Sequence, residues 1–176
     1  MSAVPDARRL VRRGLSVFPL PPGGRVPEPG WQQLSTQDEA ALPGLLAAGH
    51  NVGIGCRASR VVALDLDAHD EGPTRSGIET LLIRMETLGL VDWPRTLTVM
   101  TPSTGLHLYF RVSRDCTIGG RTALGPGIDV RGPGRRSGGY LVGPGSIVGG
   151  LPYTLVSDVP VAPLPRWIEG LLSLAA

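Results

Sequence analysis

The segment VVALDLD (residues 61–67) places apolar and acidic residues at alternate positions. Successive side chains of a β-strand point to opposite faces of the sheet, so Val62, Leu64 and Leu66 share one apolar face. The two aspartates share the other face. This pattern predicts a strand that buries one side and carries ionisable groups on the other.

Two later segments repeat this alternation. In LHLYFRV (106–112) the apolar residues oppose a histidine, a tyrosine and an arginine, and in GIDVR (127–131) they oppose an aspartate and an arginine. A simple alternative is that each polar face is solvated, as is common in antiparallel sheets. The residue types favour a functional site instead, because aspartate is disfavoured in strands and these three segments contain three aspartates.

The acidic residues have the chemistry of a cation site. Asp65 and Asp67 would have Cα atoms roughly 6.6 Å apart on one face of a strand, where two unpaired carboxylates repel each other. Short carboxylates on rigid strands suit Mg²⁺, which keeps waters and takes further ligands from substrate phosphates. Asp129 on a neighbouring strand would complete a three-carboxylate site, and two bound ions can stabilise both oxygens of a phosphoryl displacement. His107 and nearby arginines then suit a triphosphate.

Composition excludes several classes of protein. The chain has 176 residues, with 17 basic side chains, all of them arginine, and 15 acidic ones, for a formal net charge of +2. No apolar run approaches the roughly 20 residues of a transmembrane helix, and the charged N-terminus lacks the apolar stretch of a signal peptide. Cys56 and Cys116 cannot form a disulfide framework. We therefore expect a cytoplasmic, reduced protein, whose near-neutral charge neither demands nor excludes nucleic acid.

The remaining patterns favour an α+β fold. Helical and strand patterns mix without regular βα alternation, which disfavours a doubly wound sheet. Thr36 and Glu39 match a capping box that would open a helix. Helices are expected at residues 4–14, 36–48, 74–90 and 165–175, and strands at 16–20, 51–55, 60–67, 96–101, 106–112, 127–131, 139–143 and 153–156. The third helix carries one apolar stripe, formed by Ile78, Leu81, Leu82, Met85 and Leu88.

Several pieces of the chain, taken in order, resemble one known family: VFPLPPGGRVPEPGWQQLST, HNVGIG, VVALDLD, TLTVMTPSTGLHLYF, GIDVRG, GGYLVGPGS and Tyr153. They cover most of the chain and are similar to the bifunctional primase/polymerase (prim-pol) domain of the archaeo-eukaryotic primase superfamily. The resemblance implies a single prim-pol domain over residues 1–176, with an RNA-recognition-like antiparallel or mixed sheet backed by helices. An N-terminal α/β unit (about 1–60) would pack on the catalytic sheet (about 61–160), followed by a closing helix (about 165–175).

Individual residues receive expected roles. The resemblance implies that Asp65, Asp67 and Asp129 are catalytic and bind Mg²⁺ or Mn²⁺, and that His107 contacts the nucleotide phosphates. Further candidates are Ser103, Gly105, Tyr109, Arg131 and Ser146 for nucleotide binding, and Arg135 and Arg136 for nucleic-acid binding. Simpler alternatives stay open, in which the tyrosine fills the edge of the core, the second serine ends a strand, and the arginines lie in a solvated turn.

The chain also departs from the family pattern. The phosphate-proximal loop of the family usually reads TPSGGxH, and Thr104 stands here in place of one glycine. The loop after Asp129 is slightly longer and adds two arginines. Ligands for the zinc-binding stem of some relatives are missing. The sequence, which ends at Ala176, contains no C-terminal helicase or primase module. Two interpretations stay open: the chain is a lone domain, or it is a fragment of a longer protein.

We therefore predict a template-directed DNA primase/polymerase that adds (d)NTPs to a 3′-hydroxyl or starts a primer on single-stranded DNA. Expected partners are the template, a primer and (d)NTPs, with a replicative helicase on another chain or in a missing C-terminal region, and no membrane. One alternative is a catalytically degenerate primase-like module that binds single-stranded nucleic acid or a replication partner. A third hypothesis, a DxD-type transferase using a nucleotide-sugar, leaves the His107 and Asp129 strands unexplained.

Overall fold

The computed structural model describes residues 3–68, 76–120 and 124–174 of the chain. The helical elements in these ranges are α1 (Val4–Arg12), α2 (Trp31–Leu34), α3 (Leu42–Leu45), the 3-10 turn η1 (Ala47–Gly49), α4 (Cys56–Ser59), α5 (Gly77–Thr87) and α6 (Arg166–Leu174). The strands are β1 (Val17–Leu20), β2 (Asn51–Gly55), β3 (Val61–Leu66), β4 (Thr98–Met100), β5 (Leu106–Arg111), β6 (Ile128–Arg131), β7 (Tyr140–Val142), β8 (Ile147–Val148), β9 (Leu151–Pro152), β10 (Thr154–Ser157) and β11 (Ala162–Pro163). The mixed α+β composition is thus confirmed. Within the described part of the chain, no helix is long and apolar enough to cross a bilayer.

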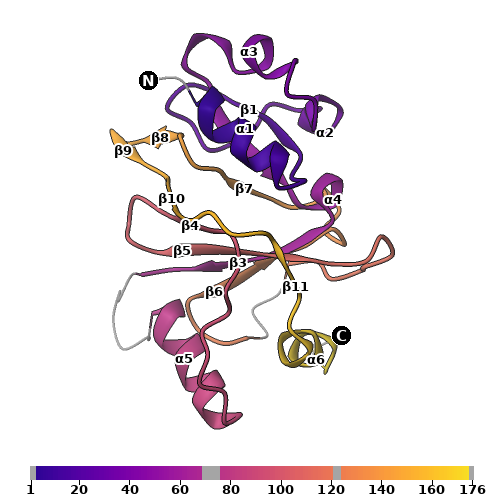
Figure 1. The fold of residues 1–176 in the computed structure, drawn as a ribbon, viewed down its shortest axis with the longest axis vertical. Helices are drawn as coiled ribbons and strands as arrows, with labels where there is room; N and C mark the ends of the chain where they lie inside the picture. Colours follow the sequence, from indigo (N-terminus) through magenta and orange to yellow (C-terminus); the bar gives the residue numbers. More distant parts are fainter. Residues whose placement is uncertain (1–2, 69–75, 121–123, 175–176) are drawn as a thin grey trace.

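The strands form two main sheets (Figure 1). A small antiparallel sheet has the order β1-β2-β7, and a large sheet has the order β10-β4-β5-β3-β6, with β11 parallel to β5. β8 and β9 pair separately. Because β7 comes late in the chain, the small sheet joins residues 17–55 to residues 140–142. The division into an N-terminal unit and a catalytic sheet stays a prediction.

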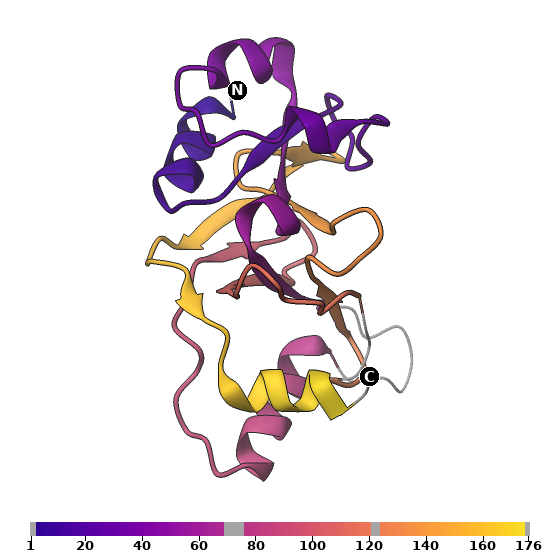
Figure 2. The same cartoon turned by 90° about the vertical axis from the view of Figure 1, so that its right-hand side faces the viewer.

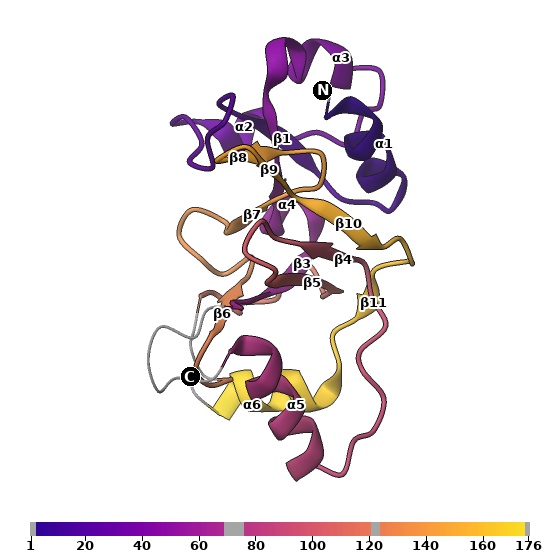
Figure 3. The same ribbon diagram turned by 90° about the vertical axis from the view of Figure 1, so that its left-hand side faces the viewer.

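The elements stack in three layers. The small sheet lies at one end of the molecule with α1, α2 and α3, the large sheet lies in the middle, and α5 and α6 lie at the other end (Figure 2). Seen from the opposite side, both helices again lie beneath the large sheet (Figure 3), and Figure 1 shows α5 and α6 under its two sides. The large sheet is therefore covered on both faces.

The alternation predicted for the central strand is confirmed. Val62, Leu64 and Leu66 of β3 are fully buried, and they share a core with Leu81 of α5 and Ile168 of α6. This apolar face holds the two long helices against the sheet. Each fully buried aliphatic side chain contributes about 1.5–3 kcal/mol to the hydrophobic free energy.

The opposite face of β3 is covered along half of its length rather than solvated. Val61 and Ala63 are fully buried in a second core, which lies between the two sheets and includes Phe18 of β1 and Leu141 of β7. Further along the strand, Asp65 lines a pocket instead. The small sheet thus closes one end of this face and leaves the other end accessible.

The helix predicted over residues 36–48 is wrong. Both the N–H and the carbonyl of Thr36 form hydrogen bonds with Val17 in an isolated bridge. The carbonyl of Thr36 is therefore not available for the first hydrogen bond of a helix. Glu39 binds the guanidinium of Arg12, with distances of 2.9 and 3.1 Å, instead of capping a helix. Only the short α3 and η1 form in this range, because a capping-box spacing cannot start a helix at a residue held in a bridge.

The third predicted helix is confirmed as α5, with a later start and a narrower apolar stripe. Ser76 and Glu79 form a reciprocal capping box that fixes its first turn. Leu82 and Leu88 are each 49% exposed, so their predicted place in the buried stripe is wrong. Residues 74–75 lie outside the described residues, as does residue 175 of the closing helix. The other predicted elements agree with the structure to within two residues at each end.

Candidate active site

The register of the large sheet sets three of the predicted residues side by side. β3 lies between β5 and β6, and Asp65 is the direct cross-strand partner of both His107 and Asp129. Directly opposed residues point to the same face, with Cβ atoms roughly 4.5–5.5 Å apart. The three side chains therefore form one row across three strands, on the face that looks toward the small sheet.

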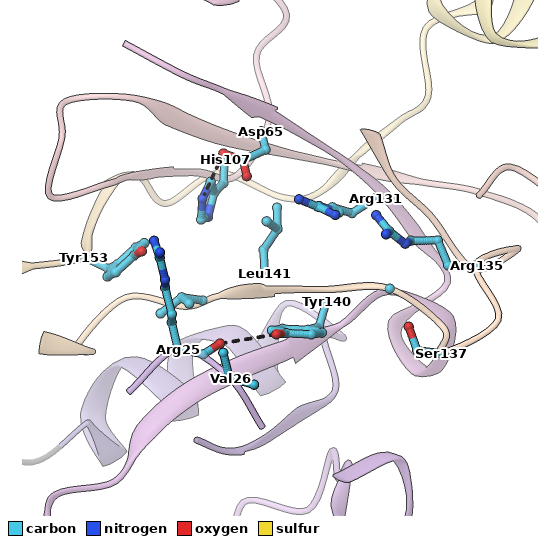
Figure 4. A pocket seen from close by; sticks show the side chains of 12 residues that line it. Arg25, Val26, Asp65, His107, Arg131, Arg135, Ser137, Tyr140, Leu141 and Tyr153 are labelled. Carbon is cyan, nitrogen blue, oxygen red and sulfur yellow. Dashed lines mark hydrogen bonds and ion pairs between the residues drawn. The ribbon is translucent and has the colours of Figure 1, made fainter. Parts of the chain in front are cut away.

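His107 is the most buried member of this row. Only 3% of the residue is exposed, and its Nε2 lies 3.3 Å from Oδ1 of Asp65 (Figure 4). The imidazole ring lies beside that of Tyr153, with centroids 5.7 Å apart. Among the described residues, its Nδ1 has no hydrogen-bond partner. An unsatisfied buried polar group costs about 1–3 kcal/mol, so this nitrogen lowers the stability of the fold.

Asp129 is paired with a cation on its own strand. Nη2 of Arg131 donates to Oδ2 of Asp129 at 2.7 Å, because residues two apart on a strand share a face. Its positive charge offsets the repulsion between Asp129 and Asp65, which like charges in directly opposed positions experience. Each of the two opposed carboxylates therefore has one basic neighbour.

Asp67 lies just beyond the end of β3 and is exposed. Its N–H donates to the carbonyl of Gly127, which continues the ladder between β3 and β6. Asp67 and Asp129 line a separate hollow of about 330 Å³ over residues 125–128. In the ranges that the structure describes, no three His, Cys, Asp or Glu side chains gather closely enough to hold a metal ion. The structure thus aligns Asp65 with Asp129 across two strands and places Asp67 beyond the end of β3, in the wall of this hollow.

The chemistry of these donors nevertheless fits a hard divalent cation. Asp65 and Asp129 offer carboxylate oxygens from two adjacent strands, and Asp67 follows Asp65 by two residues. Mg²⁺ is typically bound by one or two carboxylates, with waters and substrate phosphates as its other ligands. The aligned pair offers the type and number of carboxylates that such a site uses.

A pocket of about 380 Å³ opens between the two sheets in front of this row (Figure 4). The large sheet contributes Asp65, His107 and Arg131 to its wall. The small sheet and the connecting loops contribute the remaining lining residues, which are Arg25, Val26, Arg135, Ser137, Gly139, Tyr140, Leu141, Val142 and Tyr153. Its volume lies in the range of small-molecule sites, about 300–1,000 Å³.

Positive charge dominates the pocket. Three arginines line it, and among the described residues none of the ion pairs involves Arg25 or Arg135. Only Arg131 has an acidic partner. A guanidinium group offers several N–H donors in a planar fork that matches a phosphate group. The unpaired arginines therefore favour an anionic ligand.

Two tyrosines line the pocket: Tyr153 lies beside His107, and Tyr140 lies on the opposite wall. Burial raises the pKa of the Tyr153 phenol above the ordinary 10.0, and the negative charge of Asp65 raises it further. Burial also raises the pKa of Tyr140, against the opposing effect of the nearby arginines. Both phenols are therefore neutral at pH 7 and can serve as hydrogen-bond donors and as apolar ring surfaces.

The predicted phosphate-proximal loop lies against the end of β3 and lines none of the pocket described above. Ser103 Oγ lies 3.0 Å from Thr101 Oγ1, which also accepts from the N–H of Gly105. A Cβ atom at Gly105 would lie 2.5 Å from the carbonyl oxygen of Leu66, so only glycine fits this position. Thr104 has a φ of +66°, a conformation that a β-branched residue adopts only under strain.

Two other candidates lie in the core. Tyr109 is completely buried between the sheets, and burial holds its pKa well above the usual value. Ser146 is also fully buried, and its hydroxyl accepts from the N–H of Val52 at 2.9 Å and donates to the carbonyl of the same residue at 3.3 Å. Neither residue lines the pocket. Their positions agree with the packing alternatives for both residues.

Arg135 and Arg136 lie in the loop between β6 and β7. Arg135 lines the pocket, and both arginines line a second, more open groove together with Thr117, Gly119 and Gly120. The loop is held in place by Arg57, whose guanidinium donates to the carbonyls of Pro133 and Arg135. Two arginines thus make the lining of this groove positively charged.

The pocket residues to which sequence reasoning gave no role include Arg25, Tyr140 and Tyr153. Arg25 occurs in a Pro- and Gly-rich loop, and no periodicity marks the two tyrosines as neighbours of His107. The resemblance includes Tyr153 as its last matching residue, but it assigns no role to this tyrosine.

The chain was compared with known proteins. The family described as "Bifunctional DNA primase/polymerase, N-terminal" matches residues 7–167. The matched range extends from α1 into α6 and includes every residue of the pocket. No curated protein matches the chain.

Proposed function

The chain belongs to the bifunctional DNA primase/polymerase family, and on this premise we propose that it is a template-directed nucleotidyltransferase acting on single-stranded DNA. Membership of the family implies nucleotide and nucleic-acid substrates and a general dependence on metal ions. The finer proposal is that this chain extends a primer, or starts one, with (d)NTPs.

The observation that carries the proposal is the row of Asp65, His107 and Asp129 at the edge of an arginine-lined pocket. A primer 3′-hydroxyl, or the hydroxyl of a first nucleotide, would attack the α-phosphate of the incoming nucleotide, and pyrophosphate would leave. Such a reaction needs anionic ligands beside the reacting phosphate and cationic side chains along the triphosphate. The pocket brings Asp65 together with three arginines, and Asp129 lies next to Asp65 on β6, where it lines the separate hollow.

Each residue has a distinct part in this proposal. Asp65 and Asp129, joined by Asp67, would hold Mg²⁺ or Mn²⁺, which when bound neutralises developing charge on the phosphates. Arg131 and Arg135 orient the triphosphate. His107 lines the pocket and would donate a hydrogen bond to a phosphate oxygen from its protonated ring nitrogen.

A gel assay on single-stranded template, with and without a primer, tests the proposal. With Mg²⁺ or Mn²⁺ and each nucleotide set in turn, the wild type should incorporate nucleotides, and product without a primer would demonstrate priming. Asp65→Asn, Asp67→Asn and Asp129→Asn should each lower incorporation about a hundredfold or more. Asp92→Asn, at an exposed position away from the pocket, is the matched control. Full activity of both Asp65→Asn and Asp67→Asn would refute the assignment.

A catalytically degenerate binding module is the second candidate. The observation that favours it is that no cluster of three metal-ligating side chains is found in the described ranges. Against it stands the presence of all three carboxylates predicted from the motifs. Binding of single-stranded DNA by the wild type, with no incorporation under any metal and nucleotide condition, would support this module.

A further inference from the structure

The loop after β1 carries Arg25 to the pocket from the side of the small sheet. In Figure 4 its guanidinium points toward Tyr153, across the pocket from Arg135. Arg131 and Arg135 reach the pocket from β6 and the loop that follows it. The cationic groups thus come from two opposite walls, and a ligand between them would be contacted from both sides.

Two consecutive carbonyl groups of this loop are anchored by side chains. Nδ2 of Asn51 donates to the carbonyl of Gly24 at 2.8 Å. Oη of Tyr140 donates to the carbonyl of Arg25 at 3.3 Å, while its ring packs against Phe18 and Trp31 with centroids 5.7 and 5.4 Å away. The backbone from which the arginine extends is therefore fixed, although the side chain itself is exposed.

Asn51 connects this loop to the segment after β7. Its Nδ2 also donates to the carbonyl of Ile147 at 2.9 Å, and its Oδ1 accepts from the N–H of the same residue at 2.8 Å. Asn51 is the only asparagine of the sequence and is 3% exposed. Both the NH₂ group and the oxygen of its side-chain amide form hydrogen bonds. Aspartate lacks the N–H donors and therefore cannot replace it without losing the bond to Gly24.

Two independent features indicate that the pocket binds an anion. The guanidinium of Arg25 forms no ion pair within the described ranges. The guanidinium of Arg135, on the other wall of the pocket, forms none there either. Two cations that have no acidic partner and line the same 380 Å³ space from opposite walls match the oxygens of a phosphate chain.

We propose that Arg25 binds the phosphates of the incoming nucleotide from the small-sheet wall, and that Asn51 is a positioning residue that holds the Gly24–Arg25 backbone for this contact. The identity of the ligand as a nucleotide rests on the proposed function. The groove along Arg135 and Arg136 is left for the DNA strand, because it is more open than the pocket.

Binding measurements without catalysis test the first part. Calorimetry with dATP and with inorganic tripolyphosphate is compared between the wild type and Arg25→Ala, and binding of a fluorescent single-stranded oligonucleotide is measured in parallel. Loss of one charge-assisted contact should weaken both phosphate ligands about tenfold and change DNA affinity less than about twofold. Arg166→Ala, an exposed arginine on α6, removes the same charge far from the pocket and should change neither affinity.

Each outcome has a clear meaning. Unchanged dATP affinity in Arg25→Ala, or a loss confined to the oligonucleotide, would overturn the proposal. Wild-type protein that binds tripolyphosphate through Arg25 but incorporates no nucleotide would refute the polymerase function and leave this contact in place. Wild-type protein that binds neither phosphate ligand would refute both.

A double-mutant cycle tests the second part. Asn51→Asp should weaken dATP binding severalfold and raise the KM for the nucleotide with little change in kcat. In the Arg25→Ala background the same substitution should have almost no further effect, because it acts through the lost side chain. Tyr140→Phe removes the second anchor and keeps the ring, and it repeats the test if Asn51→Asp does not fold. If the losses of dATP affinity add fully when Asn51→Asp and Tyr140→Phe are each combined with Arg25→Ala, the positioning role is refuted.

Discussion

Asp65 of β3 and Asp129 of β6 are direct cross-strand partners, so two carboxylates face each other on adjacent strands. Like charges in this position destabilise a sheet, and each carboxylate here has a basic neighbour, His107 or Arg131, that lessens the repulsion. A fold that keeps this pair gives up stability at the site. This arrangement leads to predictions about stability as well as activity.

Asp65→Asn should lower nucleotide incorporation and leave the protein as stable as the wild type or more stable by up to about 1 kcal/mol. The amide removes the charge repulsion with Asp129, and its Oδ1 can still accept a hydrogen bond from Nε2 of His107. Urea unfolding followed by circular dichroism measures the change. A loss of stability well above 1 kcal/mol would mean that the carboxylate has a structural role.

His107→Phe should raise the nucleotide KM about tenfold without unfolding the protein. Phenylalanine fills a similar volume and removes both ring nitrogens: the Nε2 that lies 3.3 Å from Oδ1 of Asp65, and the buried Nδ1 that has no partner among the described residues. Thr80→Val on α5 is the matched control, because it also removes a buried, unpartnered polar atom but lies on the other side of the large sheet. Equal KM values for the two variants would contradict a phosphate contact at His107.

Thr104→Gly should stabilise the protein by about 0.5–1 kcal/mol. The threonine is held at a φ of +66°, which glycine adopts without a steric penalty, and this gain exceeds the entropy that glycine loses on folding. Thr117→Gly, at an exposed threonine without a positive φ, should instead destabilise by a similar amount. Urea unfolding checks both results: at an unchanged m-value, the midpoint should rise for Thr104→Gly and fall for Thr117→Gly.

The stability of the protein should fall as the pH rises from about 9 to 12. Burial raises the pKa of the Cys56 thiol to about 12, and the nearby charges of Arg131 and Arg135 offset this only in part. Below pH 9 the thiol is protonated in both the folded and the unfolded chain, so its contribution is fully present there. Above pH 9 only the unfolded chain ionises, and up to about 4 kcal/mol is lost by pH 12.

Urea midpoints at pH 7, 9 and 10.5 check this dependence. Cys56→Ala should show a smaller loss between pH 9 and 10.5 than the wild type. The loss should not vanish, because burial also raises the pKa of Tyr109. An identical pH profile for the two proteins would show that Cys56 does not contribute.

The helix at 36–48 shows where local patterns are insufficient. The Thr36–Glu39 spacing and the Ser76–Glu79 spacing both match a capping box, and only the second forms one. The difference lies in β1, because Val17 takes both backbone hydrogen-bonding groups of Thr36. No property of residues 36–39 themselves carries that information.

The sequence by itself determined β3, β5 and β6 of the large sheet, the apolar face of each and the candidates Asp65, His107 and Asp129, because a period of two residues specifies which side chains share a face. It also carried the family match over residues 7–167. Only the tertiary structure decided that the small sheet closes over this face and adds Arg25, Tyr140 and Tyr153 to the pocket, while Tyr109 and Ser146 are buried in the core. Periodicity records the face on which a side chain lies, whereas the segment that covers that face is set by packing between residues far apart in the chain.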